Sequence, residues 1–210
     1  MKRIVNYINE KLRVTSKSFY TCQPNTKDEL QEIIIKRIKE DGNDCDLNDI
    51  DVSKITDMSC LFNANTDWNS GNKIFKYFNG DISQWNVSNV TNMCGIFNWC
   101  DKFNCDISLW DVSNVEDMEH MFNYCGHFNC DISRWNVSNV ENMYAMFQFC
   151  YEFNCDLSRW HVSNVNNMKW MFRRCTNFKQ NLDMWNVSNV KNMDDAFIGC
   201  PTKPKWYNGY

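Results

Sequence analysis

The sequence predicts an α/β repeat solenoid with an N-terminal α-helical cap. Two observations lead to this fold class. Five tryptophans, from Trp85 to Trp185, recur every 25 residues, and the tetrapeptide Val-Ser-Asn-Val recurs with the same period. A unit of this length has too few apolar side chains to offset its own loss of conformational entropy. Successive units must therefore stack and share one core.

Residues 1–42 are predicted to form a helical N-terminal cap for the stack. Thr26 and Glu29 match a capping box, and Gly42 stands where the helix that they begin would end. A shorter helix is expected over residues 3–12. The apolar residues that share one face of the longer helix are Leu30, Ile33, Ile34 and Ile38.

The repeat is predicted to span residues 43–202. Its first coil, residues 43–77, is degenerate, because Met58 and Met93 are 35 rather than 25 residues apart. The ten extra residues are interpreted as a bulging loop between Asn63 and Tyr77. Five regular coils follow. Residues 203–210 are predicted to be a C-terminal capping tail, in which Trp206 and Tyr207 fold over the last coil.

Each regular coil is predicted to contain one short strand and one short helix. Trp85 and Val87 alternate with polar residues, which is typical of a half-buried strand. Ser88 stands where the N-cap of the following helix belongs, and the equivalent Ser113 and Ser138 begin capping boxes with Glu116 and Glu141. The apolar residues of that helix follow a 3.6-residue period: Val90, Met93, Ile96, Phe97 and Cys100.

The repeat resembles a known family. Ile82, Trp85, Val87 and Val90 match the frame of leucine-rich repeats. The motif F-N-x-D-I-S-x-W-[ND]-V-S-N-V-x-N-M-x-x-M-F-x-x-C closely resembles the repeats of BspA-like leucine-rich-repeat surface proteins, whose core domain is largely of unknown function. The resemblance covers about residues 43–202. It implies a right-handed, leucine-rich-repeat-like solenoid, often displayed on microbial surfaces and involved in adhesion or protein binding.

Composition and motifs exclude several classes of function. The net charge of −4 gives no basic attraction to nucleic acid, and no apolar run is long enough to span a bilayer. The sequence contains no phosphate-binding loop and no nucleophile placed with a histidine and a carboxylate. We therefore expect a protein that is not an enzyme and that needs no cofactor. The start of the chain does not resemble a secretory signal, which predicts a cytoplasmic location. A cell-surface location, or secretion by an unusual route, is the alternative.

The repeat also aligns cysteine, aspartate and asparagine residues in columns. Buried structural thiols are the favoured interpretation of the cysteines, with some disulfides or a metal site as alternatives. The aspartates are expected to form Asx-turns, although a calcium site is conceivable. The asparagines from Asn79 to Asn154 are expected to form a hydrogen-bond ladder. The cysteine columns are Cys100, Cys125, Cys150, Cys175 and Cys200, and Cys105, Cys130 and Cys155; the aspartate column is Asp81, Asp106, Asp131 and Asp156.

Positions that vary between coils are the candidate binding residues. On the predicted strand face, Arg134, Arg159 and His161 would lie side by side and could contact an acidic partner, although a solvated face is the alternative. Leu109 and Met184 occupy the same column as the two arginines. A second group, on the side and at the end of the predicted helix, is interpreted as an exposed ridge: Tyr144 and Trp170 on the side, and Trp99, Tyr124, Phe149 and Arg174 at the end. The alternative is that Trp99, Tyr124 and Phe149 partly cover the neighbouring coil.

The sequence therefore predicts a non-enzymatic protein-interaction module. Its partner is expected to be a protein, and the chain itself a monomer or weak oligomer. A microbial surface adhesin that binds a host protein or glycan is the alternative function.

Overall fold

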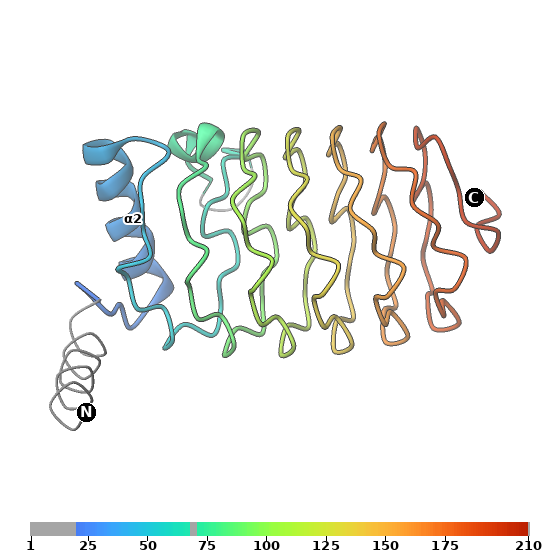
Figure 1. Cartoon of the computed structure of the whole chain (residues 1–210), viewed down its shortest axis with the longest axis horizontal. Helices are drawn as coiled ribbons and strands as arrows, with labels where there is room; N and C mark the ends of the chain where they lie inside the picture. Colours follow the sequence, from blue (N-terminus) through green and yellow to red (C-terminus); the bar gives the residue numbers. More distant parts are fainter. Residues whose placement is uncertain (1–19, 68–70, 210) are drawn as a thin grey trace, which may run out of the picture.

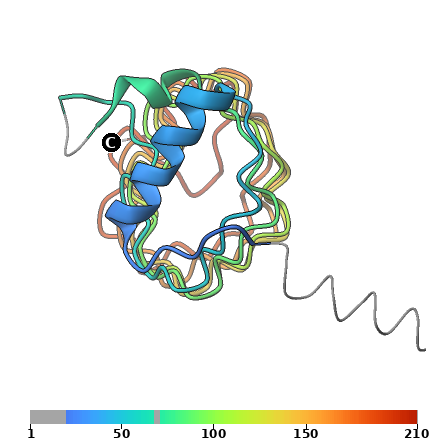
Figure 2. The same ribbon diagram turned by 90° about the vertical axis from the view of Figure 1, so that its left-hand side faces the viewer.

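The protein is a stack of irregular coils with a helix at one end and a short tail at the other (Figure 1). The structure is a computed structural model that describes residues 20–67 and 71–209. The helix expected over residues 3–12 lies outside these ranges. Viewed along the stack, the coils superimpose around a common interior (Figure 2). Aromatic side chains fill this interior.

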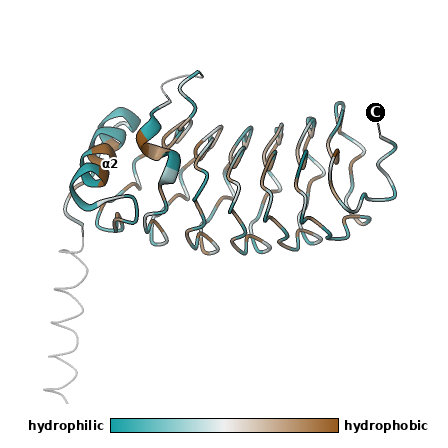
Figure 3. Cartoon of the chain, turned by 90° about the horizontal axis from the view of Figure 1, so that it is seen from above, coloured by the Kyte–Doolittle hydropathy of each residue, from teal (hydrophilic) through white to brown (hydrophobic). Residues whose placement is uncertain are grey.

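The predicted capping helix is present as α2 (Lys27–Asp41). Thr26 accepts a hydrogen bond from the Glu29 amide at 3.2 Å, and the Gly42 amide donates to the Ile38 carbonyl. Polar and apolar residues lie on different sides of α2 (Figure 3), and the apolar side covers the first coil. Its fully or largely buried residues are Leu30, Ile34 and Ile38, whereas Ile33 is only partly buried.

The predicted α/β solenoid is wrong. Among residues 20–67 and 71–209, the only helices are α2 and the 3-10 helix η1 (Lys73–Tyr77). The coils contain neither the short strand nor the short helix that a leucine-rich-repeat frame requires. The β-pairing between neighbouring described coils consists of isolated parallel bridges, such as those of Asn142 with Asp117 and with Asn167.

Backbone conformation explains why the predicted coil helix does not form. Tyr124 and Phe149 have φ angles of 59° and 60°, in the left-handed region that interrupts an α-helix. Alternate amides also bond outside their own coil: the Phe122 amide donates to the Met146 carbonyl at 2.9 Å. The intervening amides close tight turns, as in the bond from Cys125 to Phe122. These consecutive tight turns point the same side chains into the core that an α-helix with a 3.6-residue period would have buried.

Side-chain acceptors explain why the predicted strand does not form. The Ser88 amide donates to the Asn86 side chain at 3.2 Å and the Trp85 amide to the Ile82 carbonyl, so neither is available to a ladder. Ser88 therefore belongs to an Asx-turn and caps no helix. The same correction applies to the two predicted capping boxes, because the Glu116 amide bonds to the Thr91 carbonyl of the preceding coil.

Side chains at fixed repeat positions join each coil to the preceding one. The Trp135 indole donates to the Ile107 carbonyl at 3.1 Å, and the Asn139 side-chain amide donates to the Ser113 carbonyl at 2.7 Å. The predicted asparagine ladder is confirmed: the Asn129 side-chain oxygen accepts the Asn154 amide at 2.8 Å. Two columns of phenylalanine rings stack between these bonds, with ring centroids 3.9 Å apart for Phe122 and Phe128.

The insertion in the first coil departs from the outline shared by the other coils (Figure 2). The Asn72 amide closes it by donating to the Asn63 carbonyl at 2.8 Å. η1 follows, and its buried Phe75 lies edge-on against Phe62, with ring centroids 5.6 Å apart. The insertion is thus anchored to the core by one aromatic ring.

The C-terminal tail continues the tryptophan column beyond the last coil. The Trp206 indole stacks on that of Trp185 and donates to the Leu182 carbonyl at 2.8 Å. Tyr207 lies over Phe197 with ring centroids 5.1 Å apart. Trp206 thus occupies the place that a further coil's tryptophan would take.

Candidate functional site

The predicted Asx-turns are confirmed, and they set the floor of a groove on one side of the stack. The Asp131 side chain accepts the Ser133 amide at 3.0 Å, and Asp156 accepts the Ser158 amide at 2.9 Å. Hydrogen bonds from the Ser133 side chain and backbone lower the pKa of Asp131. The aspartates are thus ionised at neutral pH and orient the turn from which the next side chains project.

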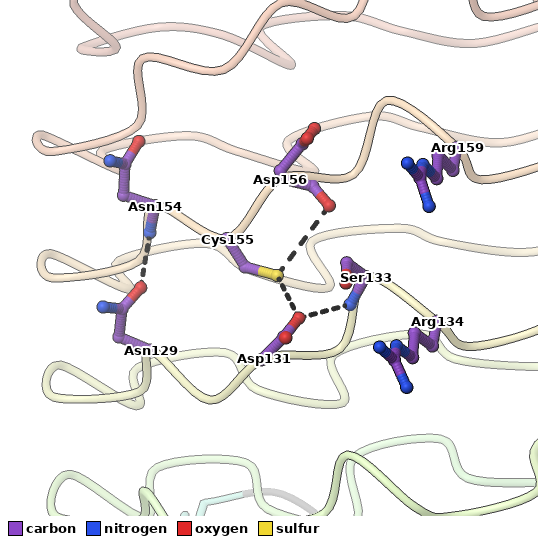
Figure 4. Close-up of a pocket in the computed structure, with 8 residues that line it drawn as sticks. All are labelled: Asn129, Asp131, Ser133, Arg134, Asn154, Cys155, Asp156 and Arg159. Atoms are coloured by element: carbon purple, nitrogen blue, oxygen red, sulfur yellow. Dashed lines mark hydrogen bonds between the residues drawn. The ribbon is translucent and has the colours of Figure 1, made fainter.

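Two arginines follow these turns and flank the groove. Figure 4 shows Arg134 and Arg159 on the same side of it, one above the other, with Asp131 and Asp156 nearer its centre. The groove has a volume of about 490 Å³. Both arginines are exposed, and neither forms an ion pair with any residue in the described part of the chain. Their guanidinium groups are therefore available to an external anion.

Large apolar side chains flank the arginines in the same column. Leu109 is 81% exposed and Met184 is 88% exposed, whereas most apolar side chains of the coils are buried. We call Leu109, Arg134, Arg159 and Met184 the arginine face. His161 is exposed as well, but it does not line the groove that the structure places beside the two arginines.

The predicted aromatic ridge is present as a stack of rings. The centroids of Trp99 and Tyr124 are 4.3 Å apart, and those of Tyr124 and Phe149 are 4.2 Å apart. The rings cover one another, so that Trp99 is 39% exposed and the other two are half-buried. Both sequence interpretations thus hold in part. Arg174, in the same column, is exposed.

Tyr144 and Trp170 belong to a second, separate aromatic group. Their ring centroids are 5.4 Å apart, and the Arg173 guanidinium lies 5.0 Å from the Trp170 ring. His120 packs edge-on against Tyr144, and burial lowers the pKa of His120 to about 4. His120 is therefore neutral at neutral pH, and its 3.8 Å approach to Glu119 contributes little as an ion pair.

The cysteines act as structural thiols in the core. The buried Cys150 thiol donates to the Phe122 carbonyl at 2.9 Å, and the same bond recurs along its column. In the second column, the Cys155 thiol accepts the Ile132 amide at 3.4 Å. All twelve cysteines are free. No group of three or more metal-ligating side chains occurs in the described ranges.

One row of charged groups on the surface was not predicted from the sequence. His127 contacts Lys102 through Nε2 and Glu152 through Nδ1, the latter at 2.7 Å. The three residues are 25 positions apart, so the repeat period could have identified the row. Their types differ from coil to coil, and this difference concealed them.

These features define the class of protein as a repeat protein of stacked 25-residue coils, with an arginine face and separate aromatic groups on its surface. The chain belongs to the family described as "Mycoplasma protein of unknown function, DUF285", which it matches over residues 34–133 and again over residues 100–208. No curated protein and no solved structure matches it. None of the helices that the structure describes has the length and apolar character needed to cross a membrane.

Proposed function

We propose that the protein is a non-enzymatic interaction module that binds an acidic segment of a protein on the arginine face. The observation that carries this proposal is the exposure of Leu109 and Met184 on either side of two unpaired arginines. Methionine, arginine and aromatic residues are enriched at interfaces, whereas lysine and glutamate are depleted from them.

The repeated polar side chains support this assignment, because they are already bonded within the stack. The repeated asparagine, tryptophan and cysteine side chains are engaged in bonds between coils. A partner that recognises this protein must therefore contact positions that differ from coil to coil. The arginine face consists of such positions, on four consecutive coils.

The order of residues on the face defines the chemistry of the partner. Along the stack the face reads apolar, cationic, cationic, apolar, from Leu109 to Met184. Arginine pairs with carboxylates in a planar, two-point geometry. An extended segment with two carboxylates between apolar side chains matches this order. The neighbouring Asp131 and Asp156 would repel such carboxylates unless these reach the guanidinium groups from outside the groove.

A selection experiment tests the proposal without a known partner. The full chain is presented to a display library of random 12-residue peptides. We expect the enriched peptides to combine aspartate or glutamate with apolar residues. The variant Arg134→Glu/Arg159→Glu should weaken their binding by at least about tenfold. Lys73→Glu/Lys76→Glu, which makes the same change of charge on η1, should leave binding unchanged. Enriched peptides without acidic residues, or equal loss in both variants, would contradict the proposal.

The resemblance to BspA-like surface proteins supports a second candidate function, adhesion at a microbial surface. The exposed Trp99 of the aromatic ridge, stacked on the half-buried Tyr124, favours it, because stacked aromatic edges are common in binding surfaces. Fractionation of native cells distinguishes the two locations. Recovery of the protein only from the cytosol counts against adhesion, whereas its digestion by protease added to intact cells supports adhesion.

A further inference from the structure

The last coil of the stack presents an incompletely covered side. Val187, Val190 and Met193 are half-buried, whereas the equivalent Val137, Val140 and Met143 of an interior coil are at most 1% exposed. Trp206 and Tyr207 of the tail cover Trp185 and Phe197 but leave this strip open. We call residues 187–195 on this side the open edge.

Backbone groups along the open edge lack the partners that their equivalents have. Inside the stack, the Met168 and Trp170 amides donate to the Asn192 and Asp194 carbonyls of the next coil, at 2.7 and 3.0 Å. One coil later, the Met193 and Asp195 amides find no acceptor among the described residues. The open edge therefore presents two free donors beside an apolar strip.

Two acceptors complete the pattern. In the preceding coil, the Ser163 carbonyl accepts the Asn189 side-chain amide at 2.7 Å, and the Asn166 carbonyl accepts the Lys191 amide at 2.8 Å. The equivalent carbonyls of Ser188 and Lys191 have no such donor among the described residues. Two acceptors followed by two donors thus lie in a fixed order along the edge.

We propose that the open edge binds, in trans, a polypeptide segment that carries the repeat's own sequence Ser-Asn-Val-x-Asn-Met and the residue after it. The interfaces between coils within the chain show that this segment meets all four groups at once. Its asparagine side chain reaches the Ser188 carbonyl, and its backbone bonds to Lys191, Met193 and Asp195. Its valine and methionine cover the half-buried strip.

The N-terminal end of the stack differs from the open edge, because a helix covers it. There, α2 buries Leu30 and Ile34 against the first coil, and its Gln31 side chain donates to the Leu61 carbonyl at 2.8 Å. The N-terminal side of a second intact copy is therefore already covered. The ligand of the open edge must be an uncovered coil segment of another polypeptide with this repeat.

A synthetic peptide with the sequence of residues 135–146, WNVSNVENMYAM, is the probe for this inference. We expect it to bind the full chain with a Kd of about 0.1–1 mM, because it is disordered before it binds. Binding should slow hydrogen exchange of the Met193 and Asp195 amides. The variant Val190→Lys, at a half-exposed site, should weaken binding at least about tenfold.

Two controls define the outcome. The peptide in which the asparagine equivalent to Asn139 is alanine and the valine equivalent to Val140 is aspartate should not bind. The protein variant Met184→Ala changes the arginine face and should bind the peptide normally, which separates this inference from the proposed function. No saturable binding below about 1 mM, or binding that Val190→Lys does not weaken, would overturn the inference.

Discussion

The indole Nε1 of Trp135 donates a hydrogen bond to the backbone carbonyl of Ile107, 3.1 Å away in the preceding coil. The bond lies in the interior, where Trp135 is 4% exposed. It joins two coils at a point where neither contributes a strand. Bonds of this kind join the coils, together with the isolated bridges and the backbone hydrogen bonds between them.

Replacing Trp135 with phenylalanine should lower the free energy of unfolding by about 1–3 kcal/mol. The change removes the indole donor from the buried Ile107 carbonyl, which keeps only the Trp110 amide, and it creates a cavity beside that carbonyl. Urea denaturation followed by circular dichroism measures the effect. Trp206→Phe is the matched control, because Trp206 makes the same bond at the half-exposed end of the stack. A loss as large for Trp206→Phe as for Trp135→Phe would contradict this interpretation.

Ala145 is a buried alanine with a φ angle of 52°, a conformation that costs a residue with a Cβ about 1–2 kcal/mol. Ala145→Gly relieves this strain. Ala196 is equally buried but has no positive φ. Ala196→Gly therefore relieves no strain; it removes a methyl group and increases the backbone freedom of the unfolded chain, and both changes lower stability. We expect Ala145→Gly to be more stable than Ala196→Gly by at least about 1 kcal/mol in thermal or urea unfolding. Equal stabilities would show that the coil turns do not hold left-handed residues under strain.

The Asn139 side-chain amide donates to the Ser113 carbonyl at 2.7 Å. Asn139→Asp replaces this donor with a carboxylate and should cost about 1–3 kcal/mol of stability at neutral pH. Asn136→Asp is the control, since Asn136 serves only as an acceptor in its turn and Asp111 makes the same bond in the preceding coil. Urea titrations of both variants should show a loss for the first and little change for the second. The reverse order would refute the assigned role of the Val-Ser-Asn-Val asparagine.

Alkaline pH should destabilise the protein through its thiols. Burial raises the pKa of Cys105 and of Cys155 to about 11, above the value of about 9 for an exposed thiol. A raised pKa favours the protonated form in the folded state, so this contribution is complete below about pH 9 and is lost as the pH rises to about 11. The free energy of unfolding should fall across this window. The fall should be smaller in Cys105→Ala/Cys155→Ala, and an identical pH profile in this variant would exclude the thiols as its cause.

The sequence predicted which residues meet but not the backbone that brings them together. The period of Trp85 and its equivalents correctly indicated columns of like residues, because any stack of equal coils aligns them. The spacing of Val90, Met93, Ile96 and Phe97 indicated a helix, yet consecutive tight turns turn the same positions inward. Among the coils, glycine marks the left-handed positions only at Gly95 and Gly199; the other such positions hold cysteine, histidine, alanine, aspartate, arginine or an aromatic residue. A residue type that does not favour positive φ gives no local signal of it.

Only part of the candidate site could be predicted, because the repeat reveals which positions vary but not how the coils are aligned in space. The exposure of Leu109 and the arginines follows from their variable column, which the repeat makes visible. The row of Lys102, His127 and Glu152, and the uncovered side of the last coil, depend on how coils are aligned in space. Neither has a motif of its own.

Hydrogen exchange of the full chain, with and without an acidic peptide enriched by selection, locates the binding surface. We expect protection in the segments that contain Leu109, Arg134, Arg159 and Met184, and no change in those that contain Trp99, Tyr124 and Phe149. Protection confined to the aromatic ridge would show that the arginine face is not the binding surface and would assign recognition to another surface of the stack.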